Sequence, residues 1–393
     1  MDTVVGCVAL LVLLPVLVLL AEVISAITAG SDPASIQGER RRLAVLIPAH
    51  NEATVIVATL RSILPQLLPG DRAVVVADNC TDGTEAIARR EQAEVLVRTN
   101  TVQRGKGFAL DYGIRHLEHD RPDVVIVVDA DCDVEDGGIE KLARACDHFH
   151  RPIQALYLMR HPSNARPRMK IAEFAWIVKN RVRPAGLRHL GLPCQLTGSG
   201  MAFPWTQISG ARLATGHIVE DLKLGIDLAR EGAPPVYLPD CVITSEFPQS
   251  EEGASEQRKR WEHGHLDIIS RVAPGLIWDG VTRANLDLLA LGLDVIVPPL
   301  ALLTLLAAVV WFGALLLLLL PGSSPVPLII ATLVASLLFL AVCLSWVKFG
   351  RRVLSGADLC YSAFYALIKI PMYLRFLISR QTAWVRSKRN HES

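Results

Sequence analysis

The stretch VVIVVDADCDVEDGGIE, residues 124–140, decides the fold class of this 393-residue chain. Its first half is an uncharged, β-branched run, typical of a strand buried on both faces, and it ends abruptly in Asp129, Asp131 and Asp133. These acids and Glu140 also match positions 1, 3, 5 and 12 of an EF-hand calcium loop. That loop needs a preceding helix and a glycine at position 6, where this chain has a strand pattern and a valine. The stretch therefore indicates a buried strand with an acidic end.

Three further apolar runs, at 43–48, 73–78 and 93–97, read as strands, and the segments between them have helical composition. Strands that alternate with helices predict an α/β domain with a mostly parallel central sheet covered on both faces. Ligands of such sheets bind beyond the carboxyl ends of the strands. The chain places polar side chains at these ends, namely His50, Asn51, Glu52, Asp78, Asn79, Asp129 and Asp131.

The composition points to a membrane part and away from a nucleic-acid partner. Hydrophobic residues make up 51% of the chain, and the mean hydropathy is +0.34. A formal net charge of +1 gives no reason to expect a polyanion partner. The eight cysteines show neither CxxC pairs nor zinc-ligand spacing, which fits reduced thiols facing the cytosol.

Two regions are long and apolar enough to cross a bilayer, which needs about 20 residues per helix. Residues 1–29 form the first, and a secretory signal peptide is disfavoured because no Lys or Arg precedes residue 40. Residues 288–347 form the second, and the turn sequence PGSSPVP at 321–327 divides it into a helical hairpin whose first helix Pro298 and Pro299 should kink.

Basic clusters follow the first span and the hairpin and continue along the tail, so the positive-inside rule predicts three spans with an external N-terminus. The soluble domain, 43–275, then faces the cytoplasm, and we expect an integral protein of the bacterial inner (plasma) membrane. Residues 353–393 mix apolar and basic side chains. They suit an amphipathic interface helix and a basic tail on membrane lipids, although a re-entrant element is also compatible with 353–380.

Asp129 and Asp131 project to the same side, because side chains alternate along an extended chain. Two carboxylates so placed can hold Mg²⁺ or Mn²⁺, hard cations that prefer oxygen ligands. A merely solvated strand end is the competing interpretation, and the DxD pattern alone does not separate the two.

An ordered set of motifs over residues 43–275 resembles the membrane-integrated family 2 inverting glycosyltransferases, which include the cellulose, hyaluronan, chitin and poly-N-acetylglucosamine synthases. The resemblance implies a GT-A type fold and transfer of a sugar from a nucleotide donor, with UDP the expected nucleotide. The motifs are IPAHNE (47–52), ADNCTDGT (77–84), QRGKG (103–107), DADCD (129–133), TGSGMAF (197–203), VEDLKLG (219–225) and QRKRW (257–261).

The resemblance assigns roles to particular residues of this chain. Asp221 of VEDLKLG is the expected general base, and Val219 stands where the family usually has threonine. Asp129 and Asp131 are the expected metal ligands. Donor contacts are expected from Pro48, Ala49, Glu52, Asp78, Lys106, Asp129, Gln257, Arg258 and Arg260. Acceptor contacts are expected from Gly198, Ser199, Gly200, Glu220 and Trp261.

Structural alternatives exist for several of these residues. Asp78 could cap the turn NCTDGT, and Lys106 could be a solvated helix start. Glu220 and Asp221 would also suit the first turn of any helix, because acids there interact favourably with the helix dipole. Trp261 could be a membrane-interface anchor. The resemblance favours the functional interpretation at each position.

The acceptor remains open between two chemistries. The motif QRKRW resembles that of chain-extending members, which favours a growing polysaccharide. Three spans are few for a polymer channel, so such a protein would form a homo-oligomer, recruit an accessory membrane protein or not translocate its product. The alternative acceptor is a membrane lipid, as in ceramide glucosyltransferase-like proteins.

Overall fold

The structure, a computed structural model, describes residues 1–30, 36–161, 166–248 and 251–378. It divides into two compact units, each treated by itself. The sheet domain comprises residues 36–161, 193–248 and 251–264, and the helical domain comprises residues 1–30, 166–192 and 265–378. The sequence pattern placed residues 166–192 and 265–275 in the catalytic domain, whereas their contacts are with the apolar helices.

The sheet domain is built on an eight-stranded sheet with the order β3-β2-β1-β4-β7-β6-β8-β5. β1, β2, β3 and β4 run parallel, β7 is antiparallel to both β4 and β6, and β8 runs parallel to β6. The expected mixed α/β architecture is confirmed. The strands are β1 (Leu43–Ala49), β2 (Arg72–Asp78), β3 (Glu94–Arg98), β4 (Val124–Val127), β5 (Asp133–Val134), β6 (Ile153–Arg160), β7 (Met201–Pro204) and β8 (Val236–Glu246).

Helices cover the sheet on both faces, which explains why the parallel strands are uniformly apolar. Side chains of α4 and α9 pack with alternate residues of β1, β2 and β4 in one core, which includes Leu46, Ile114 and Leu224. α5 packs against β4, β6, β7 and β8. The helices and helical turns of this domain are α2 (Ile56–Ile63), η1 (Leu64–Gln66), α3 (Thr84–Arg90), α4 (Lys106–Leu117), α5 (Gly138–Phe149), α8 (Trp205–Ile208) and α9 (Glu220–Arg230), and most of α10 (Glu251–Arg271) also belongs here.

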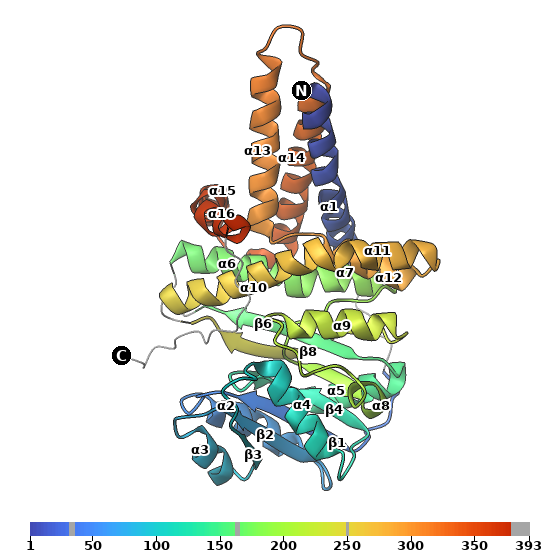
Figure 1. The fold of residues 1–393 in the computed structure, drawn as a ribbon, viewed down its shortest axis with the longest axis vertical. Helices are drawn as coiled ribbons and strands as arrows, with labels where there is room; N and C mark the ends of the chain where they lie inside the picture. The colour runs from blue at the N-terminus through green and yellow to red at the C-terminus, as the bar shows by residue number, and fades with distance from the viewer. Residues whose placement is uncertain (31–35, 162–165, 249–250, 379–393) are drawn as a thin grey trace. The chain divides into compact units, whose positions relative to one another are not determined.

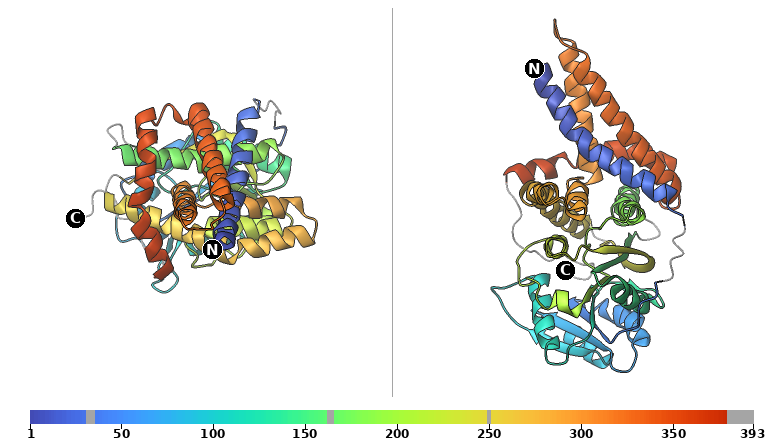
Figure 2. Two further views of the ribbon diagram at one scale, coloured as in Figure 1. Left: turned by 90° about the horizontal axis from the view of Figure 1, so that it is seen from above. Right: turned by 90° about the vertical axis from the view of Figure 1, so that its right-hand side faces the viewer.

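In the helical domain, α1, α13 and α14 pack together as a three-helix bundle (Figures 1 and 2). Three helices of the described chain are long and apolar enough to cross a membrane: Asp2–Thr28, Leu300–Leu318 and Val326–Gly350. The elements of this domain are α1 (Asp2–Thr28), α6 (Pro167–Ile177), η2 (Val178–Val182), α7 (Arg183–His189), α11 (Ala273–Thr282), α12 (Leu286–Val295), α13 (Leu300–Leu318), α14 (Val326–Ser345), η3 (Trp346–Gly350), α15 (Gly356–Ile368) and α16 (Ile370–Ile378).

The expected kink at Pro298 and Pro299 is instead a break between two helices. α12 ends at Val295 and α13 begins at Leu300, so the prolines lie in the connection. Proline lacks a backbone N–H and disfavours helical geometry in the residue before it, and two in succession stop a helix more readily than they bend it. The hairpin proper is therefore α13 and α14, and the segment 353–378 contains two further helices, α15 and α16.

A buried ionic cluster fixes α1 to the helices packed at its end. Arg183 on α7 donates from Nε to Glu22 on α1 at 2.7 Å, and its guanidinium also pairs with Asp294 on α12. Each of these three side chains is less than 7% exposed. Beside the cluster, the backbones of α1 and α7 touch so closely that a Cβ on Gly186 would lie 2.0 Å from the carbonyl oxygen of Glu22.

Candidate active site

The candidate active site forms where the acidic stretch after β4 meets the glycine-rich loop before β7. β4 ends at Val127, and the chain leaves the sheet ahead of Asp129 and Asp131. The backbone N–H of Asp129 donates to Ser199 Oγ at 3.1 Å. The backbone N–H of Gly200 donates to the carbonyl oxygen of Val127 at 2.9 Å. These bonds hold the acidic stretch and the loop 197–200 together at the edge of the sheet.

Lys106, Asp129 and Asp221 converge on Gly198. Lys106 begins α4, and its ammonium pairs with Asp129 and donates to the carbonyl oxygen of Gly198 at 2.7 Å. A Cβ built on Gly198 would lie 3.2 Å from Asp221 Oδ2, 3.5 Å from Lys106 Nζ and 3.8 Å from Asp129 Oδ2. The expected metal-ligand position and the expected base position therefore border the same space.

The charges of these groups are strongly coupled. Burial alone lowers the pKa of the Lys106 ammonium, but Asp129, Glu220 and Asp221 outweigh it and raise that pKa above its ordinary value. Burial raises the pKa of Asp129, and Lys106 opposes the rise. Burial and the neighbouring Asp221 raise the pKa of Glu220 to about 7. The site thus has more carboxylates than the single lysine neutralises.

The donor set suits a hard divalent cation. Potential ligand atoms of Asp129, Asp131 and Cys132 all lie within 4.8 Å of one another. Burial, with Asp131 and Asp129 nearby, raises the pKa of the Cys132 thiol well above its ordinary value, so the thiol stays protonated. The hydroxyl of Ser199 donates a hydrogen bond to the sulfur of Cys132 at 3.1 Å. The available ligands are therefore carboxylate oxygens, which Mg²⁺ and Mn²⁺ prefer.

Asp78 lies at the end of β2 in a buried ion pair. Its Oδ1 accepts from Arg98 at 2.6 Å and from Asn79 Nδ2 at 3.0 Å. Asp78 and Arg98 are direct partners in the β2–β3 register. The sequence pattern missed Arg98, because an arginine that ends a strand carries no signal until the register is known. Arg98 therefore fixes the carboxylate of Asp78 and compensates its charge, at the rim where the nucleotide is expected.

The other expected donor contacts from β1 lie on the same rim as Asp78. Pro48 is half-buried and Ala49 is buried, both at the end of β1. The backbone N–H of Glu52 donates to Thr84 Oγ1 at 2.7 Å, which fixes the loop after β1 to the start of α3. Nδ1 of His50 lies 2.6 Å from the carbonyl oxygen of Asp78. These bonds connect the ends of β1 and β2 into one surface.

Among the three expected acceptor residues of the loop, only Gly198 borders the space between the acids. Ser199 is fully buried behind Asp129, where its hydroxyl holds the acidic stretch rather than facing outward. Gly200 has φ +68°, and a Cβ there would lie 2.6 Å from the side chain of Ile243. The structure thus makes Ser199 a positioning residue and Gly200 a packing position, a division that the glycine spacing did not reveal.

The motif QRKRW lies on α10, where Gln257, Arg258, Arg260 and Trp261 are all half-buried. α10 packs tightly against the start of α9, because a Cβ on Gly264 would lie 2.6 Å from Val219. Val219, the departure from the family pattern, therefore has a packing role. Burial lowers the pKa of Arg260, opposed by Glu220, Asp129 and Asp221. Within the described chain, Gln257 Oε1 is buried without a hydrogen-bond partner.

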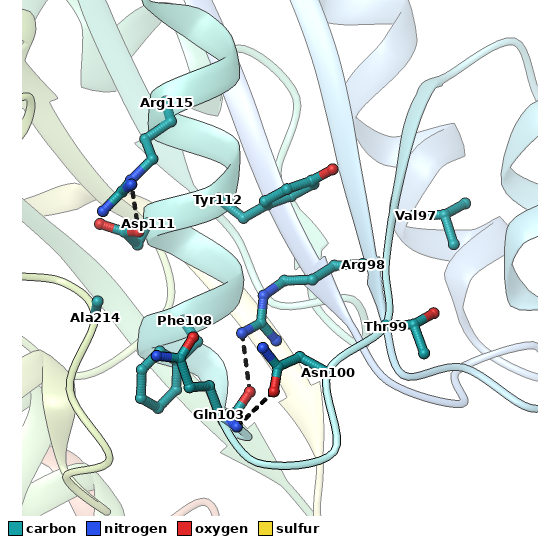
Figure 3. Close-up of a pocket in the computed structure, with 10 residues that line it drawn as sticks. All are labelled: Val97, Arg98, Thr99, Asn100, Gln103, Phe108, Asp111, Tyr112, Arg115 and Ala214. Carbon is teal, nitrogen blue, oxygen red and sulfur yellow. Dashed lines mark hydrogen bonds and ion pairs between the residues drawn. The ribbon is translucent and has the colours of Figure 1, made fainter.

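An open cavity of about 580 Å³ lies between the end of β3 and α4 (Figure 3). Its two arginines are already paired, Arg98 with Asp78 and Arg115 with Asp111, so the cavity has little net charge. Ala214 lines this cavity, while its neighbours Leu213 and Thr215 line a smaller one with Lys106, Glu220 and Asp221. The segment 213–215 therefore separates the large cavity from the site.

The rim of this mixed sheet thus gathers Lys106, Asp129 and Asp221 around one space. The chain belongs to the Glycosyltransferase like family 2, whose profile matches residues 40–264.

Individual relatives support this assignment. A solved structure of a mannosyltransferase from Pyrobaculum calidifontis, in complex with GDP-Man and Mn²⁺, is similar in fold over 93% of this chain and 98% of its own, with a TM-score of 0.56 and 19% identity. A glucomannan 4-beta-mannosyltransferase of Arabidopsis thaliana is 24% identical over 59% of this chain and 44% of its own. A probable glycosyltransferase of Bacillus subtilis, YdaM, is 35% identical over 24% of this chain and 23% of its own. The chain spans less than half the length of the curated relatives it matches.

Proposed function

We propose that this family 2 glycosyltransferase transfers a hexose or N-acetylhexosamine from a nucleoside diphosphate sugar to a growing polysaccharide, with inversion at the anomeric carbon. The observation that supports this most directly is the approach of Asp221 and Asp129 to one point beside Gly198. Such a transfer needs a proton acceptor on one side of the sugar and charge compensation on the other. In this proposal Asp221 is the proton acceptor, and Asp129 helps to compensate the charge of the leaving group.

In this proposal Asp221 takes the proton from the acceptor hydroxyl as the new glycosidic bond forms and the bond to the diphosphate breaks. Lys106 holds Asp129 in position through their ion pair and adds positive charge next to the departing diphosphate. Arg260, Arg258 and Gln257 on α10 contact the donor, while Glu220 and Trp261 border the acceptor. Mg²⁺ or Mn²⁺, held by Asp129 and Asp131, would supply electrostatic stabilisation of the leaving group when bound.

The donor nucleotide sits at the rim formed by Pro48, Ala49, Glu52 and Asp78. UDP sugars are the first donors to test. GDP-mannose is the next donor to test. The fold neighbour from Pyrobaculum calidifontis is a complex with GDP-Man and Mn²⁺, and a curated relative is a mannosyltransferase.

We further propose that α1, α13 and α14 span the bacterial inner membrane with the N-terminus external and the sheet domain in the cytoplasm. Lengths of 27, 19 and 20 residues and the uncharged composition of α13 and α14 support the spans. The basic residues Lys348, Arg351 and Arg352 directly after α14 support a cytoplasmic end there.

A lipid acceptor is the second candidate, and the small number of spans favours it. Three apolar helices in the described chain leave little material for a polymer channel in a single copy. Product length separates the two acceptors: a ladder of oligosaccharides supports polymer synthesis, whereas one sugar per lipid supports lipid glycosylation.

The decisive experiment measures nucleotide release by the purified full-length protein from a panel of UDP and GDP sugars, with and without added Mn²⁺. We expect release from at least one donor, its loss with a chelator, and a fall of about 10²- to 10⁴-fold in Asp221→Asn. Asp227→Asn, which alters a carboxylate paired with Lys223 on the same helix, is the matched control. Unchanged activity in Asp221→Asn would exclude the proposed base.

A further inference from the structure

Four exposed basic residues of the helical domain, Arg181, Lys348, Arg351 and Arg352, form what we call the basic belt. None of the four has a carboxylate partner among the described residues. By contrast, two exposed arginines on helices of the sheet domain, Arg89 and Arg144, each pair with a glutamate one turn away. The belt is therefore a local excess of uncompensated positive charge.

Aromatic rings support two of these cations. The Arg181 guanidinium lies 5.5 Å from the centre of the Phe349 ring, and that of Arg351 lies 5.4 Å from the centre of the Trp346 ring. Trp346 also donates its indole N–H to the carbonyl oxygen of Leu354 at 2.8 Å, which fixes the ring. Arginines stacked on rings keep their N–H groups directed outward and lose little freedom when they bind an anion.

The belt lies at the end of an apolar helix. Trp346 and Phe349 belong to η3, which directly continues α14. η3 packs against α6, because a Cβ on Gly350 would lie 2.6 Å from the ring of Phe174. Arg181, which follows α6 in the chain, contacts Phe349 of η3, and Arg351 directly follows η3. Aromatic and basic side chains at the end of a span are typical of the membrane–water interface, where phosphate groups lie.

We propose that the basic belt is a binding surface for the phosphate groups of anionic phospholipids. Arginine binds phosphate through two parallel N–H donors, and no carboxylate of the described chain has to be displaced first. The rings of Phe349 and Trp346 lie where lipid headgroups meet acyl chains. The inference rests on the proposed membrane placement, but it does not depend on the donor, the acceptor or the chemistry of transfer.

The test compares lipids retained by the full-length protein after extraction from vesicles that contain equal amounts of phosphatidylglycerol and phosphatidylcholine, counted by native mass spectrometry. We expect the wild type to retain mainly phosphatidylglycerol. The variant R181Q/K348Q/R351Q/R352Q should lose this preference. The ratio of retained phosphatidylglycerol to phosphatidylcholine should fall by about fivefold for each charge that contributes. The matched control R61Q/R89Q/R90Q/R121Q removes the same charge from the sheet domain and should keep the preference.

A wild type that retains both lipids equally, or a belt variant that retains the wild-type preference, would overturn the proposal. If the belt variant does not fold, a salt series on the wild type decides instead, because screening should abolish an electrostatic preference; a preference independent of salt overturns it. Extraction of the wild type by alkaline carbonate would show that the membrane placement itself is wrong. Retention of the protein in the membrane without a lipid preference would refute the proposed phospholipid binding by the basic belt and leave the membrane placement intact.

Discussion

Gly198→Ala tests whether the two acids and the lysine act on one shared space. The residue has φ +97°, and the added Cβ would lie 3.2 Å from Asp221 Oδ2 and 3.5 Å from Lys106 Nζ. Such a backbone conformation costs an alanine about 1–3 kcal/mol of unfolding free energy. In addition, the carboxylate of Asp221 has to give way by a few tenths of an ångström. The substitution therefore strains the backbone and displaces the expected base.

Gly232→Ala separates these two effects. Gly232 has φ +90°, close to that of Gly198, but nothing lies within 4 Å of the Cβ it would carry. Both variants should lose a similar amount of stability, seen as similar falls in Tm. A displacement of about 1 Å can cost about 10²-fold in rate, so a few tenths of an ångström in Gly198→Ala should lower kcat/KM about tenfold. Gly232→Ala should retain wild-type kcat/KM.

The assay is nucleotide release from the donor identified in the panel, measured well below the Tm of both variants. Equal kcat/KM in Gly198→Ala and Gly232→Ala would refute the argument, because it would mean that the space beside Gly198 is not where transfer occurs. A tenfold loss confined to Gly198→Ala, with matched falls in Tm, is the expected outcome.

Three other substitutions test neighbouring parts of the site by thermal denaturation. Arg98→Met breaks a buried ion pair and should cost about 3–5 kcal/mol, whereas Arg42→Gln, at an exposed pair, should cost at most about 1 kcal/mol. Ser199→Ala leaves the part-buried N–H of Asp129 without this acceptor and should cost about 1 kcal/mol and weaken Mn²⁺ binding; unchanged Mn²⁺ affinity would contradict its positioning role. In the folded protein, burial raises the pKa of Glu220 to about 7, above its ordinary value of 4.5. The unfolded chain therefore loses this proton at a lower pH than the folded protein does, and the free energy of unfolding falls as the pH rises from about 4.5 to 7. Glu220→Gln should therefore have a higher Tm than the wild type at pH 8 but not near pH 4. The exposed Glu231→Gln is the control, and we expect no such pH dependence from it. A difference in Tm between Glu220→Gln and the wild type that is the same at both pH values would contradict the raised pKa.

The sequence was sufficient for the sheet because its strands are buried on both faces. An apolar run such as 43–48 has to be shielded from water on both faces, which covering helices do. The strands β1 and β2 follow the expected runs closely. The end of β4 is different. The apolar run suggested a strand through Asp131, yet β4 stops at Val127, and the N–H of Asp129 donates a hydrogen bond to the Ser199 hydroxyl. That bond joins residues 70 positions apart, and no local pattern encodes it.

Residues 166–192 show a second limit of sequence patterns. Their composition resembles other helices of a catalytic domain, and they stand between two strands of its sheet, β6 and β7. Arg183 joins this segment to the helical domain through Glu22 and Asp294, which come from distant parts of the chain. An arginine inside an amphipathic segment looks solvated until its partners are known. The same reasoning applies to Arg98, whose role follows only from the pairing of β2 with β3.

The cluster of Glu22, Arg183 and Asp294 has a consequence for biogenesis. If α1 spans the membrane as proposed, its carboxylate Glu22 costs about 2.5–3.5 kcal/mol to insert, and it is synthesised 161 residues before its partner Arg183. The first helix would then have to be held by the insertion machinery while these 161 further residues are translated. A nascent chain stopped before Arg183 would retain this unmatched acid, which would give membrane quality control a means of recognising incomplete copies.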